Sequence, residues 1–357
     1  MSTPRITTIE KLHEYLHVAM QLEHATIPPY LLALYSIYPG ANPAATQVLR
    51  TVVVEEMLHL TLAANMMNAT GGQPNLNADN FVPVYPAYLP DGEDYFQVGL
   101  GPFSHDALKT FLNIERPSEI PPEKRLLKRT APPPPRESTL VVVSSDDGLD
   151  HATIGEFYDE IISGFKYLAG QPGVNLFSGD PKKQATSEYY YSGGGELFAV
   201  TDLDSAVRAA ELIKGQGEGS QKEIHNTENE LAHYFRFQQL QLGRYYMLND
   251  TIGNPTGPEL TVDWNAVYPF AKNAKLDQYP KDSEVYAAAE EFNAQYAGFL
   301  AFLTRAYNGE PHLLLEAVPK MFRIRNLILQ LIHNPFPGKE NENAAPTFEI
   351  QPVAVTA

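Results

Sequence analysis

The chain has 357 residues, of which 43% are hydrophobic, and a formal net charge of −17. An acidic chain is a poor partner for nucleic acid or for an anionic membrane, because both require a basic surface. The absence of cysteine excludes disulfides, thiolate metal sites and thiol nucleophiles, which leaves oxygen and nitrogen as the available metal ligands.

The N-terminal residues lack the basic start and apolar core of a signal peptide, and no apolar run approaches the length needed to span a bilayer. We therefore expect a cytoplasmic protein with no membrane partner. The hydrophobic content is enough for one large core, and we predict a single domain over residues 1–357.

The first predicted helix covers residues 8–37, and Pro28-Pro29 should interrupt or bend it. At helical spacing, Glu23 falls inside an apolar stripe, where a carboxylate is costly unless it is paired or bound to metal. We interpret the opposite side as a solvated face. The apolar stripe consists of Leu12, Leu16, Ala19, Met20 and Ile27. The solvated face consists of Glu10, His13, Glu14, His17, Gln21 and His24.

The second predicted helix, over residues 44–69, is apolar almost all round, which is typical of a buried helix. Glu56 and His59 are three residues apart and therefore share one helix face, where they offer two converging ligands. Glu55 points elsewhere, and we leave it out of the predicted site.

Residues from about 74 to 150 are rich in proline, and we expect an insertion with one short helix over residues 104–113. The tract Ala131–Pro135 should adopt extended polyproline conformation. An irregular segment of this length tends to be functional cover, and whether it acts as a lid is left open.

A third bundle helix is predicted over residues 153–169, where Glu156 and Glu160 flank the apolar stripe and both remain candidate ligands. A short helix at 203–214 precedes a fourth bundle helix over 226–248, which carries Glu230 and His233 at the same spacing as the first pair. Two more helices, at 283–307 and 311–332, are interpreted as packing elements, and an extended tail follows.

Four of the ten histidines have a glutamate three residues before them, so the spacing alone is weak evidence. We exclude the two N-terminal pairs, Glu10/His13 and Glu14/His17, from the predicted site because both lie on the solvated face of the first helix. What remains is the order Glu, Glu-x-x-His, Glu, Glu-x-x-His, which is typical of the dinuclear carboxylate site inside a four-helix bundle. We predict an all-α, ferritin-like bundle whose metal ligands are Glu23, Glu56, His59, either Glu156 or Glu160, Glu230 and His233.

Several runs of sequence resemble the ferritin-like domain found in the imine-dimer synthase of violacein biosynthesis and in related bacterial proteins. They are QLEHATIPPYLLALYSI, VVVEEMLHLTLAANMMNATGG, FLNIERP, TIGEFYDEI, GQGEGS, ELAHYFRF and ENAAPTFEI. The resemblance implies the same bundle and the same six ligands, and it favours Glu156 over Glu160.

Such a site should hold two divalent metal ions, iron first, with manganese or zinc as alternatives. We expect a non-haem di-metal oxidase or oxygenase that takes dioxygen and a small substrate, amino-acid-derived or aromatic. Tyr30, Tyr158 and Tyr234 are candidate pocket walls, proton donors or electron relays. The alternatives are iron handling as in ferritins, or a scaffold that binds metal without catalysis; the oligomeric state is open.

Overall fold

The structure is a computed structural model that describes residues 4–89, 96–117, 153–190, 194–217, 224–226 and 229–353. Within these ranges the regular structure is helical, and β-pairing is limited to isolated bridges. The predicted all-α class is confirmed. The tract Ala131–Pro135 lies outside the described residues.

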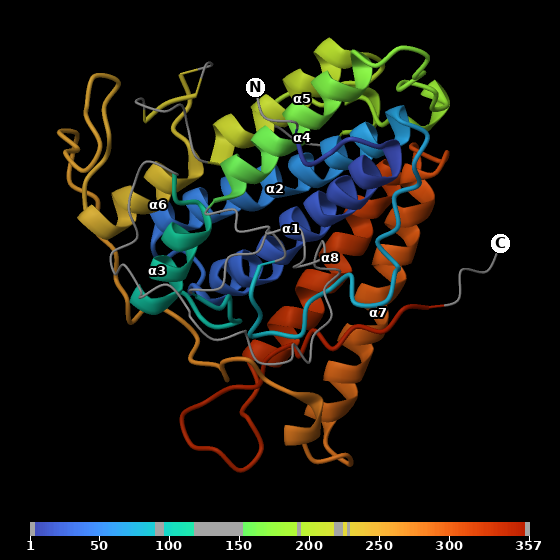
Figure 1. Cartoon of the computed structure of the whole chain (residues 1–357). Coiled ribbons are helices and arrows are strands. Elements are labelled where there is room, and N and C mark those ends of the chain that lie inside the picture. The colour runs from blue at the N-terminus through green and yellow to red at the C-terminus, as the bar shows by residue number, and fades with distance from the viewer. Residues whose placement is uncertain are drawn as a thin grey trace, which may run out of the picture.

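Four helices form the bundle: α1 (Ile9–Ser36), α2 (Pro43–Ala69), α4 (Ile154–Ala169) and α5 (Leu203–Gly217). In Figure 1, α1 and α2 lie side by side, α4 packs on α1, and α5 packs on α2 and α4. The segment expected to be only a short helix at 203–214 therefore fills the fourth place in the bundle.

The helix expected over residues 226–248 is the much shorter α6 (His233–Leu242). The residues before it are not helical, because Asn229 has a left-handed backbone (φ 60°) and Ala232 is extended. Helix α3 (His105–Ile114) packs against α6, and both contact the bundle helices at one end (Figure 1). The proline-rich segment thus contributes a helix beside the bundle core.

Helix α1 continues through Pro28 and Pro29, so the expected interruption does not occur. Proline has no backbone N–H, and Pro29 therefore leaves the carbonyl of Ala25 without its helical donor. The hydroxyl of Tyr85 donates to that carbonyl at 2.8 Å. A side chain from the segment after α2 thereby compensates for the lost backbone bond.

Helices α7 (Glu284–Tyr307) and α8 (Leu313–Ile332) pack on each other and on α1 and α2, consistent with their predicted packing role (Figure 1). The extended tail also contributes to this layer, since Phe348 is buried against the ring of Tyr296.

This layer corrects one expectation about α1. Glu10 and Glu14 are exposed as predicted, and His13 and His17 are half-buried. Gln21 and His24 are buried, because the helix passes under the α7–α8 layer after its first turns.

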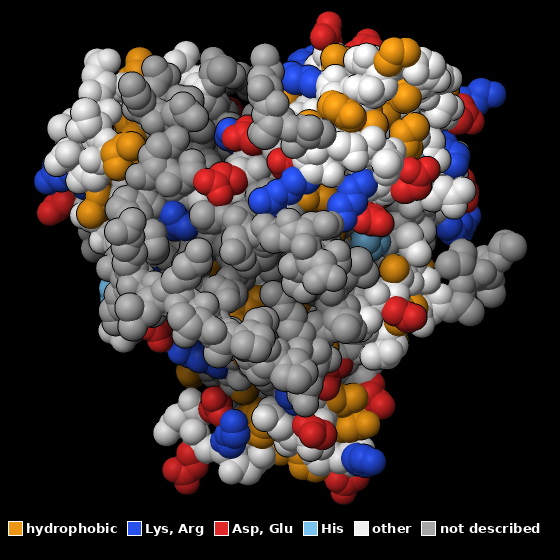
Figure 2. Space-filling view, viewed as in Figure 1, with side chains coloured by type: hydrophobic (Ala, Val, Ile, Leu, Met, Phe, Trp, Pro, Cys, Tyr) orange, Lys and Arg blue, Asp and Glu red, His pale blue; other side chains and the backbone are white. Residues whose placement is uncertain are grey.

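Acidic and basic side chains are interspersed over the described parts of the face in Figure 2. No helix in the described ranges combines the length and the apolar character that a membrane span requires.

Candidate metal centre

Five ionisable side chains meet inside the protein where the bundle helices approach α3 and α6. They come from α1, α2, the residue that ends α3, and the first residue of α6, and each is no more than 3% exposed: Glu23, Glu56, His59, Glu115 and His233. They form two groups, Glu23, Glu56 and His59 in one and Glu56, Glu115 and His233 in the other, with ligand atoms of each group within 4.8 Å of one another. Glu56 belongs to both groups.

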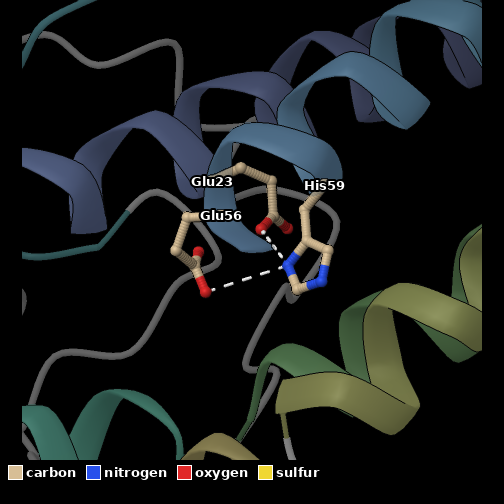
Figure 3. A group of neighbouring side chains, drawn as sticks. All are labelled: Glu23, Glu56 and His59. Atoms are coloured by element: carbon tan, nitrogen blue, oxygen red, sulfur yellow. Dashed lines mark ion pairs between the residues drawn. The ribbon is translucent and has the colours of Figure 1, made fainter. Parts of the chain in front are cut away.

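The first group follows from the pairing of α1 and α2. Glu56 and His59 share a face of α2, and the neighbouring α1 presents Glu23 from its apolar stripe (Figure 3). The Nδ1 atom of His59 lies 3.3 Å from Oε2 of Glu23 and 3.8 Å from Oε1 of Glu56.

The second group adds two ligands from outside the four bundle helices. Nδ1 of His233 lies 3.0 Å from Oε1 of Glu56 and 3.5 Å from Oε2 of Glu115. The two imidazole rings are stacked with their centroids 5.6 Å apart. The same oxygen of Glu56 is therefore near both imidazoles, so Glu56 could contribute to the binding of a metal ion in either group.

Outer hydrogen bonds orient both imidazoles. Nε2 of His59 contacts Oε1 of Gln216 at 2.8 Å, and Nε2 of His233 contacts Oε2 of Glu55 at 2.6 Å. The amide of Gln216 is itself oriented, because its Nε2 donates to the carbonyl of Gly194. Both outer partners are acceptors, so each Nε2 carries a hydrogen, and each Nδ1 faces the carboxylates and can bind a metal ion once it has lost its own proton.

The carboxylates are oriented in the same way. One oxygen of each accepts a hydrogen bond from a hydroxyl, and the other faces an imidazole. The three bonds are Tyr158 to Oε1 of Glu23 at 2.5 Å, Thr26 to Oε2 of Glu56 at 2.9 Å, and Tyr30 to Oε1 of Glu115 at 2.6 Å. Three oxygens and two nitrogens are left pointing inwards.

These inward atoms fit divalent metal ions. Nδ1 of His233 is buried and has no aligned hydrogen-bond partner within the described residues, although two carboxylate oxygens are close to it. A buried polar atom without an aligned partner is costly, and a cation that displaced the proton from this nitrogen would satisfy it. A donor set of carboxylates and imidazoles suits iron, manganese or zinc.

Burial and mutual charge shift the protonation of the metal-free cluster. Burial, followed by the neighbouring Glu115, raises the pKa of Glu56 to about 7. Burial alone would lower the pKa of His233, but Glu115, Glu55 and Glu56 outweigh it and hold that pKa well above its usual value. Without metal the cluster therefore retains protons, which metal binding would displace.

The two tyrosines that contact the carboxylates stay protonated. Burial is the main reason that the pKa values of Tyr30 and Tyr158 lie well above the usual range, and the adjacent Glu115 and Glu23 raise them further. Both hydroxyls are therefore permanent donors to ligand carboxylates. The third predicted tyrosine, Tyr234, accepts a hydrogen bond from Gln238 at 3.4 Å.

Of the six predicted ligands, the structure brings together Glu23, Glu56, His59 and His233. Glu156 is exposed in the first turn of α4, where a negative charge is favourable to the helix dipole, and it belongs to neither group. The alternative on that helix, Glu160, accepts a hydrogen bond from the backbone of Arg5.

Glu230 is half-buried and pairs locally with Asn226. The spacing of Glu230 and His233 would put both on one face only if a helix covered both residues. Helix α6 begins at His233 itself, so the carboxylate is left outside the cluster.

Sequence reasoning missed Glu115 and Glu55. Glu115 continues the apolar stripe of Leu108, Phe111 and Leu112 by one further turn, the same signal that identified Glu23. Glu55 is almost fully buried on α2, and a buried carboxylate needs a partner. That partner is His233.

Comparisons with known proteins agree with this architecture. A family model described as Ferritin-like matches residues 16–242, which include all five cluster residues. The crystal structure of a ferritin-like protein from Caulobacter vibrioides, solved at 1.95 Å resolution, superposes with a TM-score of 0.62 at 23% sequence identity. The match covers 96% of this chain and 99% of that chain. No curated protein matches the chain significantly.

Proposed function

This chain belongs to the ferritin-like family, and on that premise we propose that it is a di-metal oxidoreductase. It takes two divalent ions, iron first, on Glu23, Glu56, His59, Glu115 and His233, and it uses dioxygen to oxidise a small metabolite. Manganese or zinc would fit the same donors.

One observation carries the proposal. In every ligand side chain, one polar atom forms a hydrogen bond with a residue outside the ligand cluster, and the other polar atom points into the cluster. The inward-pointing atoms converge around Oε1 of Glu56. Such outer bonds set the tautomer and direction of metal ligands, and a merely structural cluster of ion pairs has no need of them.

Charge supports two divalent ions. Glu23, Glu56 and Glu115 contribute three negative charges, and Glu55 adds a fourth through His233, partly offset by Arg236 at 3.4 Å. Two divalent cations nearly neutralise this set. Without cations, like-charged carboxylates packed so closely are costly.

When bound, two reduced iron ions supply the electrons that reduction of dioxygen requires. The protein contributes the rest of the site. Tyr158 and Tyr30 hold the carboxylates in place and offer protonated hydroxyls beside the centre. The nearly complete burial of all five ligands keeps bulk water away. We propose an amino-acid-derived or aromatic metabolite as the substrate class.

Metal content and oxygen uptake test the proposal together. Protein loaded anaerobically with ferrous iron and freed of excess should retain about two ions per chain. On exposure to air, it should consume dioxygen faster when an oxidisable amino acid or indole from a test panel is present. Many ions per chain would indicate iron storage instead, and two ions with no oxygen uptake would leave a metal-binding scaffold.

A further inference from the structure

A second feature lies on the opposite side of α1 and α2 from the metal centre. A cavity of about 290 Å³ opens between this helix pair and the α7–α8 pair, and most of its wall is apolar. It is roughly twice the size of an engineered apolar cavity of about 150 Å³ that binds benzene. Its walls include Ile27, Leu31, Val53, Leu303, Ala317 and Ile324.

The cavity follows α1 over several helical turns. On α1 its lining runs from His24 to Tyr35, a span of eleven residues, which at the helical rise corresponds to about 16 Å. An extended alkyl chain could therefore lie along this helix between the α1–α2 and α7–α8 pairs.

Two arginines stand at one end. Arg50 of α2 and Arg325 of α8 line the cavity, and both are exposed. Burial raises the pKa of Tyr35, and Arg325 and Arg50 oppose that rise, so both guanidinium groups lie near its hydroxyl. Neither arginine forms an ion pair with a carboxylate in the described parts of the chain, whereas Arg323, two residues away, pairs with Glu291.

The other end is polar but uncharged. His24 contacts the hydroxyl of Tyr296 at 2.9 Å, and burial lowers its pKa to about 3, so it is neutral. Thr61 and Tyr307 share a hydrogen bond, and the hydroxyl of Tyr190 is buried with no hydrogen-bond partner in the described ranges. A charged group would therefore be stable at the arginine end and costly at the inner end.

We propose that this cavity binds an unbranched alkyl carboxylate, with its carboxylate between Arg50 and Arg325 and its chain extended along α1 towards His24. Arginine suits a carboxylate because its planar fork can donate two parallel hydrogen bonds. The apolar walls exclude water and favour the chain. In an acidic protein, two unpaired arginines at the mouth of an apolar channel also select against cationic amphiphiles.

This site does not depend on the metal centre. On α1, the cavity is lined by His24, Ile27 and Leu31. The metal centre uses a different face of that helix, with Glu23 as a ligand and Thr26 and Tyr30 as hydrogen-bond donors to the other carboxylates. A chain that has lost His233 should therefore still bind the carboxylate.

Titration calorimetry on the full-length protein, stripped of lipid on an adsorbent resin, tests the proposal with dodecanoate and with dodecanol. Dodecanoate should bind with a stoichiometry of one. The double variant Arg50→Gln/Arg325→Gln should weaken that binding by roughly ten-fold or more, the loss of a charge-assisted hydrogen bond, and leave dodecanol unchanged. Arg323→Gln is the matched control and should bind as the wild type does.

Ala317→Phe, which fills the channel from α8, should abolish binding of both compounds, with helical content by circular dichroism as the check on folding. His233→Ala should leave dodecanoate binding intact while metal content falls. The proposal is overturned if the double variant binds dodecanoate as tightly as the wild type, or if Ala317→Phe still binds it. It is also overturned if the wild type binds no dodecanoate. In that case, a dimer that Phe322→Glu converts to monomers would mean that a second copy fills the cavity, since Phe322 is an exposed residue of its lining.

Discussion

The two faces of the α1–α2 pair treat ionisable side chains in opposite ways. Glu23 and His24 are consecutive residues, both almost fully buried, and they contact different groups, His59 and Tyr296 respectively. Glu23 joins a cluster of carboxylates and imidazoles, where every charge has a partner. His24 faces an apolar cavity and aromatic rings, where it is neutral. Burial alone therefore does not decide ionisation; the groups packed against each face do.

The largest expected effect is at Glu56, the one residue that belongs to both candidate ligand groups. Glu56→Ala should lower the metal content from two ions to less than one per chain, because each group loses a ligand. The apolar packing of α2 remains, so helical content should be unchanged. Elemental analysis after iron loading measures the loss. Glu230→Ala, which removes the other glutamate of the repeated pattern, is the control and should keep both ions.

Glu115→Gln should have a smaller effect, because only the group that includes His233 uses this carboxylate. About one ion per chain should be retained. Glu156→Gln is the matched control on α4 and should retain two. If Glu156→Gln lost an ion and Glu115→Gln did not, the ligand set drawn from the structure would be wrong and the one expected from sequence would be right.

Glu55→Gln keeps all five inward ligands and alters only the outer partner of His233. A weakening of metal affinity by roughly 10–100-fold is expected, the usual range for such partners. Competition with a chromophoric chelator measures it. Glu14→Gln, an exposed site on α1, should leave the affinity unchanged; equal affinities for Glu55→Gln and the wild type would show that this contact does not orient the ring.

The smallest effect is on the opposite face. The pKa of His24 is lowered by burial to about 3, whereas in the unfolded chain it should be near the usual value of about 6.5. Between these values the unfolded chain binds one more proton, so this residue makes the free energy of unfolding decrease as the pH falls through that window.

His24→Phe should remove that contribution, up to about 1.4 kcal/mol per pH unit. Urea denaturation of metal-free protein at several pH values between 6 and 5 compares the two slopes. Above pH 7, His24 is neutral in both the folded and the unfolded chain, so it adds no pH dependence to the free energy of unfolding. Identical slopes for the variant and the wild type would mean that His24 becomes protonated inside the folded protein.

Periodicity alone predicted much of this molecule. The bounds of α1, α2, α4, α7 and α8 follow their apolar spacing closely, and the stripe on α1 was enough to identify Glu23. Glu115 obeys the same rule, but it ends a short helix in a proline-rich segment where no bundle helix was expected.

Other features depend on backbone and tertiary context that spacing does not encode. The left-handed Asn229 and the extended Ala232 delay the start of α6, which separates Glu230 from His233. The cavity is built from two helix pairs that are distant in sequence, and Arg50 and Arg325 are 275 positions apart. No local pattern connects such residues.

The central claim is that two metal ions share Glu56. The most direct measurement is an anomalous-scattering map of iron-loaded crystals grown without chelator. We predict two peaks, one beside Glu23, Glu56 and His59 and the other beside Glu56, Glu115 and His233. Peaks at Glu156 or Glu230, or no peak within coordination distance of Glu56, would contradict the account.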